Sequence, residues 1–428
     1  MPFRAVKGMN DILPDEIERW QQVESVFRDT VRVHGFAEVR TPIVESTALF
    51  VRSIGEHTDV VDKEMYTFER SHEHLTLRPE GTAGAARAYI EKTMHAREPV
   101  SRWYYIGPMF RAERPQKGRY RQFYQAGCEV YGDKGPASDA EIITMLYDFF
   151  GRLGIGGLDV KINSLGGNET LGRYRSVLAE YFRPRQTELS EHARTRLVVN
   201  PLRILDSKDP SDQRVAQGAP SILDVLDDGD RGHFDELCRA LDVLGTPYHV
   251  EPQLVRGLDY YTRTLFEITS TSGDLGSQNA LVGGGRYDNL IEQLGGPAVP
   301  AIGFAMGLER LLLAIPKAIA KTSLDCFFAP IGVAATRQCL RLARELRAHG
   351  LVVEVDGRGG SLKSMLRRAD ALSARCAVVL GDSELASNSV ILKDLKCHTQ
   401  ATMGIPQLHA AIEKLRQAAP AEVLGEAT

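Results

Sequence analysis

The chain has 428 residues, of which 43% are hydrophobic and 25% charged, and its formal net charge is −4. That length suits about two or three domains, and the composition is typical of a globular protein. The slightly acidic balance excludes a global basic field, so any nucleic-acid contact has to come from local patches.

The cysteines are scattered and form no CxxC pair, which argues against zinc and against a disulfide framework. This usage favours a reducing compartment. The start of the chain lacks the apolar centre of a signal peptide, and no apolar run is long enough to span a membrane. We therefore expect a cytoplasmic protein without zinc or membrane contact.

Helical spacing of apolar side chains predicts a helix over residues 15–34, followed by a strand within 36–45. Further on, a strand leads to the segment Glu80-Gly81-Thr82 and an alanine-rich helix. A carboxylate beside a glycine turn suits the capture of an ammonium group. Glu80 and Thr82 also favour a helix N-terminus, and on this stretch alone the capping interpretation is the stronger one.

The chain is organised around residues 103–131, which predict two strands joined by a basic turn. The second strand alternates with period two. One of its faces is mostly apolar and suits packing on a core. The other face predicts the floor of a pocket that reads a small polar ligand beside an anion, and it carries Arg121, Phe123, Gln125, Gly127 and Glu129.

The turn, residues 111–121, contains four arginines and a lysine. Charge runs are usually solvated. Arg111 and Arg121, however, stand at the facing ends of the two strands, and guanidinium groups hold phosphate oxygens bidentately. We expect both to point into the pocket, while Arg114 and Gln116 near the tip reach a nucleic-acid backbone or a base edge.

A helical, polar and interrupted pattern over residues 166–245 predicts an inserted subdomain. We find no chemical constellation there and expect its charged residues on solvated faces. Sheet character then returns around the segment VRGLDYY (255–261), and the glycines at 283–285 predict close backbone approach between strands or to a ligand. Arg310 falls in the first turn of a helix, where its charge and the positive helix end act on the same anion.

Short apolar strands alternate with amphipathic helices from Asp325 onward. This pattern predicts a separate α/β domain with a mostly parallel sheet. We therefore expect one domain over residues 1–323 and a second over 324–428.

Several of these segments resemble the motifs of bacterial histidyl-tRNA synthetases, a family of class II aminoacyl-tRNA synthetases, over nearly the full length. The sequence FRAERPQKGRYRQFYQAGCEVYG resembles motif 2, AIGFAMGLERLLLAI motif 3, and the region around FAEVRTPIVE motif 1. The sequences RGLDYYTRTLFE and GGGRYDNL resemble the two segments peculiar to the histidine enzymes.

The resemblance implies an α+β fold: an antiparallel-sheet catalytic domain with a helical insertion, then a C-terminal α/β anticodon-binding domain. It implies a homodimer built through motif 1. The expected activity is that of a histidine–tRNA ligase. It converts L-histidine and ATP, with Mg²⁺, to histidyl-adenylate and pyrophosphate, and then transfers histidine to the 3′ end of tRNA-His.

Residue roles also follow from the resemblance, which assigns no metal ligands. Catalytic roles at the α-phosphate fall to Arg111 and Arg256. Contacts with the imidazole fall to Glu129 and Tyr261. The full histidine set is Glu80, Gly81, Thr82, Arg111, Gln125, Glu129, Arg256, Tyr260, Tyr261 and Tyr287. The ATP set is Arg111, Glu113, Arg121, Phe123 and Arg310, and the tRNA acceptor set is Arg114, Gln116 and Arg119.

Two other interpretations remain open. Histidyl-synthetase-like regulatory subunits of ATP phosphoribosyltransferase share the catalytic fold, but they lack the anticodon domain and have lost signature residues. This chain has the extra domain and keeps the arginines at 111, 121, 256 and 310. A synthetase for another amino acid, such as proline, threonine or glycine, is disfavoured by RGLDYY together with Gln125 and Glu129.

Overall fold

The structure is a computed structural model that describes residues 3–55, 58, 60–273, 275–276, 279–316 and 324–417. It contains two compact units, Met1–Lys317 and Ala318–Thr428. The domain boundary predicted at 323/324 adjoins residues 317–323, which lie outside the described residues. Among the helices described, none has the length and apolarity needed to cross a membrane.

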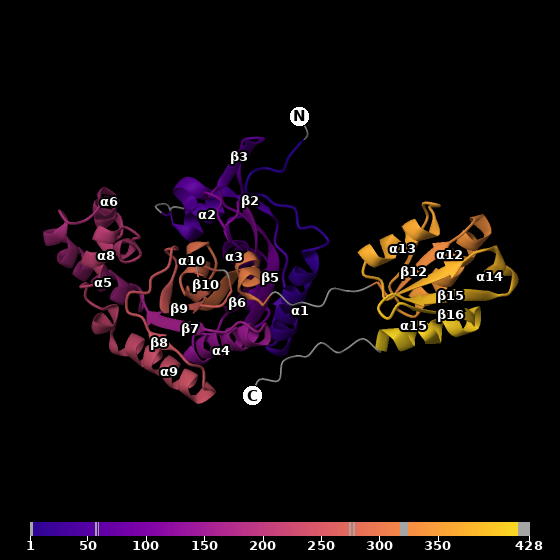
Figure 1. Ribbon diagram of the computed structural model, residues 1–428. Coiled ribbons are helices and arrows are strands. Elements are labelled where there is room, and N and C mark those ends of the chain that lie inside the picture. The colour runs from indigo at the N-terminus through magenta and orange to yellow at the C-terminus, as the bar shows by residue number, and fades with distance from the viewer. Residues whose placement is uncertain are drawn as a thin grey trace. The chain divides into compact units, whose positions relative to one another are not determined.

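An eight-stranded sheet forms the centre of the first unit (Figure 1). Its inner strands pair antiparallel, and parallel pairing is confined to the two edges, between β1 and β5 and between β7 and β8. The predicted antiparallel catalytic sheet is therefore confirmed. In spatial order the strands are β1 (Ala37–Glu38), β5 (Ser101–Phe110), β6 (Gln122–Tyr131), β11 (Ala301–Gly307), β10 (Ala280–Arg286), β9 (Thr262–Ser270), β7 (Leu158–Ser164) and β8 (His249–Val250).

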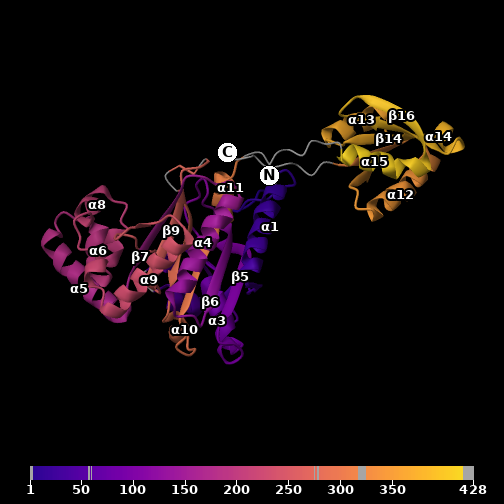
Figure 2. The same ribbon diagram turned by 90° about the horizontal axis from the view of Figure 1, so that it is seen from below.

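Helices α1 (Ile17–Val33) and α4 (Pro136–Arg152) run along this sheet (Figure 2). The ring of Phe27 on α1 makes edge contacts with Phe149 on α4, with Tyr104 on β5 and with Phe304 on β11. The apolar face predicted for the second strand of the hairpin lies here, because Cys128 pairs in register with both Tyr104 and Phe304. The opposite face is left for the site.

The segment 36–45, predicted as a strand that ends at a proline, is divided into two strands. It forms β1, then β2 (Val44–Ser46), in two different sheets. The interruption coincides with Pro42, which cannot donate to a strand ladder. Strand β2 belongs to a small sheet of order β2-β4-β3, together with β3 (Tyr66–Arg70) and β4 (Glu73–Leu77). The unit also contains the helices α2 (Thr47–Ile54), α3 (Thr82–Glu91), α10 (Leu290–Gln293) and α11 (Leu308–Ala314).

The predicted insertion consists of helices throughout its described length. Their apolar sides, including those of Tyr174, Leu178 and Phe182, join one buried cluster with residues of the main sheet and its loops. The helices are α5 (Asn168–Phe182), α6 (Glu191–Val199), α7 (Leu202–Leu205), α8 (Pro210–Ala216) and α9 (Asp228–Leu244).

The second unit is an α/β domain, but its sheet is mixed and not mostly parallel as predicted. Strand β12 pairs parallel with both neighbours, whereas β14–β15 and β15–β16 pair antiparallel. The prediction missed β16 because its residues are mostly exposed and lack an apolar alternation. The elements are β12 (Cys326–Pro330), α12 (Val333–Ala348), β13 (Val353–Val355), α13 (Leu362–Ala371), β14 (Cys376–Leu380), α14 (Asp382–Ala386), β15 (Ser389–Asp394), β16 (Thr399–Gly404) and α15 (Leu408–Gln417).

Candidate active site

A cavity of about 510 Å³ opens on the site face of the large sheet. Its wall is formed by β6, β10, β11, the turn 111–121, the start of α11 and the loop 255–261. We call this loop the histidine loop, after the segment of the histidine enzymes that it resembles. Most residues predicted for the site line the cavity: Glu80, Thr82, Arg111, Glu113, Arg119, Phe123, Gln125, Arg256, Tyr260, Tyr261, Tyr287 and Arg310.

The hairpin register explains how its residues meet. Strands β5 and β6 pair without interruption up to the turn, where the Arg111 N–H donates to the Arg121 carbonyl at 2.9 Å. Phe123 and Gln125 then point to the same face, as strand parity predicts. The Arg111 guanidinium lies 5.5 Å from the Phe123 ring centre. The side-chain oxygen of Gln125 is buried, and no described group donates to it.

Arg121 differs from its predicted orientation, since it does not line the cavity. Its guanidinium donates to the carbonyls of Glu113 at 3.3 Å and Lys7 at 3.4 Å, and its backbone N–H donates to Gly8 at 2.7 Å. The residue precedes the first residue of β6, so strand alternation does not fix its direction. Its predicted contact with ATP remains a prediction.

Glu129 is fully buried and lies behind the cavity wall instead of in it. Its carboxylate accepts hydrogen bonds from the hydroxyls of Thr82 at 2.8 Å, Tyr105 at 3.1 Å and Tyr287. It is therefore connected to the cavity through Thr82 and Tyr287, which do line it. Sequence analysis missed Tyr105; its ring occupies space left by Gly81, where a Cβ would overlap that ring.

Burial outweighs these three donors and raises the pKa of Glu129 to about 8. Burial likewise raises the pKa of Glu309 to about 7, although that carboxylate accepts from the Tyr124 N–H at 2.9 Å. This bond ties α11 to β6, beside the predicted adenine platform. In the same helix, the Arg310 guanidinium donates to the Ala280 carbonyl at 3.0 Å.

Raising the pH from about 7 to about 8.5 is expected to destabilise the first unit by roughly 1 kcal/mol. At pH 7 the folded chain binds a proton at Glu129, whose pKa is about 8, and it releases that proton as the pH rises to 8.5, whereas an unfolded glutamate is already ionised at pH 7. Because the folded state binds more protons than the unfolded state, its stability falls as the pH rises through the folded-state pKa. Urea unfolding followed by tryptophan fluorescence measures the free energy of unfolding at each pH. In Glu129→Gln this free energy should depend less on pH. An unchanged pH dependence in the variant would mean that another group titrates in this range.

Glu80 satisfies the capping interpretation. Its two carboxylate oxygens accept the backbone N–H groups of Thr82 at 2.7 Å and Ala83 at 2.8 Å, at the start of α3. The same carboxyl is almost completely buried and lines the cavity, and burial raises its pKa. Capping therefore fixes the carboxylate at the cavity wall, where it remains an acceptor for a cationic ligand group.

Arg256 extends from the histidine loop across β10. Its Nη1 pairs with a Glu267 carboxylate oxygen at 2.7 Å, and its guanidinium lies directly over Gly283. A Cβ at position 283 would overlap that guanidinium. The predicted close approach at the glycine cluster is thus confirmed. At Gly283 the approaching group is the Arg256 side chain, and at Gly284 it includes the Gly303 carbonyl of the neighbouring strand β11.

The resemblance implies that Arg256 acts at the α-phosphate, and on that expectation Gly283→Ala should lower adenylate formation by about 10- to 100-fold, because a misplacement of about 1 Å at a reacting centre has effects of that size. The three atoms nearest to the added methyl group all belong to the flexible end of the Arg256 side chain, so we expect the fold to persist. ATP–pyrophosphate exchange measures the loss. The matched control is Gly172→Ala, on α5, where a Cβ meets nothing within 4 Å. Wild-type exchange in Gly283→Ala would contradict the assigned contact.

The insertion contributes two charged side chains to the cavity wall, whereas the sequence predicted that its charged residues lie only on solvated faces. Asp206 and Lys208 follow α7 and line the cavity together with Arg256 and Glu267. The only sequence signal is their position after a short apolar run, which does not distinguish a cavity wall from a surface turn.

The tip of the motif 2 turn is closed by reciprocal backbone bonds between Gln116 and Arg119, at 3.0 and 2.9 Å. Arg119 reaches the cavity and pairs with Glu113 at 3.0 Å. Arg114 and Gln116 do not line it. Their predicted contact with tRNA remains a prediction.

Comparison with known proteins identifies the family. Residues 8–311 match the family described as Histidyl-tRNA synthetase, and residues 325–415 match the Anticodon binding domain. The chain is 60% identical over 400 residues to the histidine–tRNA ligase of Sorangium cellulosum (strain So ce56), covering 94% of both chains. It resembles apo histidyl-tRNA synthetase of S. aureus with a TM-score of 0.81 and 34% identity, covering 96% of this chain and 100% of that one.

A structure from Bacillus halodurans, described as an ATP phosphoribosyltransferase regulatory subunit/histidyl-tRNA synthetase, resembles the chain with a TM-score of 0.66. It covers 89% of this chain and 99% of that one at 20% identity, and shows the fold alone.

The antiparallel sheet, with motif 2 and motif 3 meeting at one cavity and an anticodon-binding domain following, defines a class II aminoacyl-tRNA synthetase. Within that class the chain belongs to the histidyl-tRNA synthetase family. It is an enzyme that ligates histidine to tRNA-His and uses ATP. The two alternative interpretations are thereby set aside.

Proposed function

We propose that the 510 Å³ cavity binds histidine and ATP end to end and joins them. The observation that carries the proposal is that one cavity wall contains a group for each part of the two substrates. Glu80 and the unpaired oxygen of Gln125 are acceptors, Arg111 and Arg256 are cations, and the Phe123 ring lies 5.5 Å from the Arg111 guanidinium. This set suits an α-ammonium, a reacting phosphate and an adenine.

In the proposed reaction a histidine carboxylate oxygen attacks the α-phosphorus of ATP, and the bond to the pyrophosphate oxygen breaks. Negative charge grows on the α-phosphate oxygens in the transition state, so fixed guanidinium groups stabilise it more than the bound substrates. Arg111 and Arg256 fill this role. In the second step a hydroxyl of the terminal adenosine of tRNA attacks the acyl carbon, and AMP leaves.

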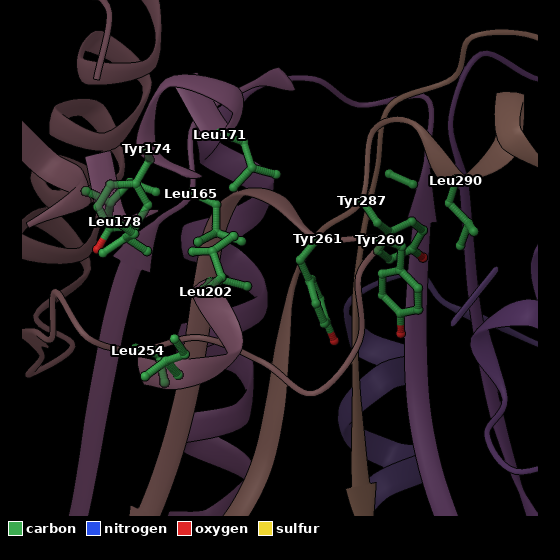
Figure 3. Close-up of a cluster of buried hydrophobic side chains, with 14 of the residues drawn as sticks. Leu165, Leu171, Tyr174, Leu178, Leu202, Leu254, Tyr260, Tyr261, Tyr287 and Leu290 are labelled. Carbon is green, nitrogen blue, oxygen red and sulfur yellow. The ribbon is translucent and has the colours of Figure 1, made fainter. Parts of the chain in front are cut away.

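Histidine selection falls to the buried polar groups around the cavity end. The rings of Tyr260 and Tyr261 lie 4.7 Å apart, with their hydroxyls pointing the same way (Figure 3). Tyr287 connects the cavity to the Glu129 carboxylate. We propose that Tyr261 and Glu129 satisfy the imidazole nitrogens, with Glu129 exchanging one of its present donors for the ligand. Sites built this way reject apolar analogues, because their own polar groups would stay unpaired.

Tyr261→Phe tests this assignment. Loss of one hydroxyl partner of the imidazole should raise the KM for histidine by about 10-fold or more, while the KM for ATP changes little. Histidine-dependent ATP–pyrophosphate exchange supplies both constants. Tyr248→Phe is the control, since the Tyr248 hydroxyl donates to the Cys238 carbonyl, away from the cavity. An unaltered histidine KM in Tyr261→Phe would remove that residue from the site.

Magnesium fits as part of the nucleotide and not as a resident ion. Among the described residues, no group of three or more metal-binding side chains occurs. Mg²⁺ in phosphate-transferring enzymes is held by substrate phosphates, water and one or two carboxylates. We propose that Asp206 or Glu113, both in the cavity wall, supplies such a carboxylate. When bound, the ion neutralises charge on the outer phosphates.

We further propose a homodimer and a cytoplasmic location. Ile43, Val44 and Phe68, in and beside the small sheet, leave 39 to 43% of their surface exposed, which supports self-association through the motif 1 region. Sedimentation of the whole chain tests it, and a monomer at micromolar concentration would reject it. The free thiols support a reducing compartment.

A further inference from the structure

Residues 200–208 of the insertion, which we call the insertion arm, hold the histidine loop. The Arg203 guanidinium donates through Nη2 to the Asp259 carboxylate at 2.6 Å and through Nη1 to the Arg256 carbonyl at 3.1 Å. Asn200 donates to the same Asp259 oxygen at 3.2 Å. One side chain of the insertion thus contacts the backbone of the residue proposed to act at the reacting phosphate.

The arm contributes a largely buried side chain to this contact. The Arg203 side chain is only 14% exposed, whereas its partner Asp259 faces solvent with 33% of its side chain exposed. Its neighbours Leu202 and Ile204 belong to the same buried cluster as Leu254, Tyr260 and Tyr261, so apolar packing continues from the arm into the loop (Figure 3). A second, small cavity of about 30 Å³ lies between arm and loop and is lined from both sides.

The histidine loop has little other polar support. It lies outside the strands and helices, and the described backbone–backbone bond made by its residues runs from the Asp259 N–H to the Ile54 carbonyl at 3.2 Å. Near the start of the loop, the Arg256 side chain pairs with the Glu267 carboxylate. Arg203 bonds both ends of the stretch between positions 256 and 259, and a planar guanidinium fork does this with defined geometry.

We propose that Arg203 is a positioning residue for Arg256, which makes the helical insertion part of the machinery for adenylate formation. The inference rests on the role proposed for Arg256. The arm also reaches the main cavity with Asp206 and Lys208, so one short segment both shapes the wall and holds the loop. A displacement of the insertion would therefore move the Arg256 guanidinium relative to the reacting phosphate.

A purely structural role for Arg203 predicts a different result, and a double-mutant cycle separates the two. If Arg203 acts through Arg256, Arg203→Ala should lower the single-turnover rate of adenylate formation by about 10- to 100-fold in the wild-type background. In the Arg256→Ala background the same change should cost less than about 3-fold. The KM for ATP should move far less than the rate constant.

The control is Arg194→Ala. Arg194 lies in the same insertion, but its guanidinium donates to carbonyls of Gln186, Thr187 and Leu189 within it, so exchange should stay within about 2-fold of wild type. Arg203→Lys covers the case in which the alanine variant does not fold. Lysine keeps the positive charge but lacks the planar guanidinium fork. We expect it to lower the rate of adenylate formation by about 3- to 10-fold, and we expect this effect to disappear in the Arg256→Ala background.

Equal losses in both backgrounds would overturn the inference, and so would a wild-type rate in Arg203→Ala. A full rate in Arg256→Ala alone would instead reject the role proposed for Arg256. The two failures are therefore distinguishable in one set of variants.

Discussion

Replacing Arg256 by alanine is expected to lower the rate of histidyl-adenylate formation by about 100- to 1000-fold, the usual effect of removing one fixed donor from a developing negative charge. Histidine should still bind, because its proposed ammonium acceptors, Glu80 and Gln125, are untouched. Single-turnover measurements report the chemical step, and equilibrium dialysis with histidine reports binding. Unchanged single-turnover chemistry would show that the proposed role is wrong.

A second variant removes an alternative explanation. Arg256→Ala leaves the Glu267 carboxylate, its partner at 2.7 Å, without its cation inside the cavity. Repulsion between that carboxylate and the phosphates could by itself slow the reaction. Adding Glu267→Gln neutralises the carboxylate. If Arg256 stabilises the transition state, the double variant stays slow; recovery to near the wild-type rate would mean that Arg256 only screens Glu267.

Replacing Arg286 by alanine should destabilise the first unit by about 3 to 5 kcal/mol, the range for breaking a buried ion pair by removing one partner. Both side chains of the Arg286–Asp139 pair are fully buried, 2.7 Å apart. Arg286 also donates to the carbonyls of Asp133 at 2.8 Å and of Gly135. Removing the guanidinium takes its donors from the fully buried Asp139 carboxylate and from two partly buried carbonyls. Tyr287, the next residue, lines the cavity.

Urea unfolding followed by tryptophan fluorescence measures this change in the first unit alone, because both tryptophans, Trp20 and Trp103, lie there. Arg239→Ala is the control. It removes an exposed pair with Glu236, whose side chains are 65% and 54% exposed, and should cost less than about 0.5 kcal/mol. A similar small effect for Arg286→Ala would mean that the surroundings relax around the lost charge.

The site hairpin shows how far local pattern reaches. A β-strand alternates strictly, so the sequence predicted that Phe123 and Gln125 share a face. The glycines at 283–285 likewise predicted close approach, because a missing side chain leaves space whatever fills it. What fills it could not be predicted: the guanidinium over Gly283 comes from a loop 27 residues earlier, and the ring beside Gly81 from another strand.

Local pattern also failed in identifiable places. Arg121 precedes its strand, so parity did not govern it. Strand β16 is polar and exists through its pairing with β15. Glu80 fitted two interpretations that the fold reconciles, because one carboxylate both caps α3 and lines the cavity.

The sequence by itself determined the domain order, the antiparallel catalytic sheet and the family, since these depend on period, turn residues and motifs that are contiguous in the chain. Only the tertiary structure decided which charges meet. In the sequence, Asp206, Lys208 and Arg203 look like surface residues of a polar insertion. The sequence also does not show that Glu129 lies behind the cavity wall and reaches the cavity through Thr82 and Tyr287. Side-chain contacts between segments distant in sequence depend on how helices and strands pack, and no local periodicity encodes that packing.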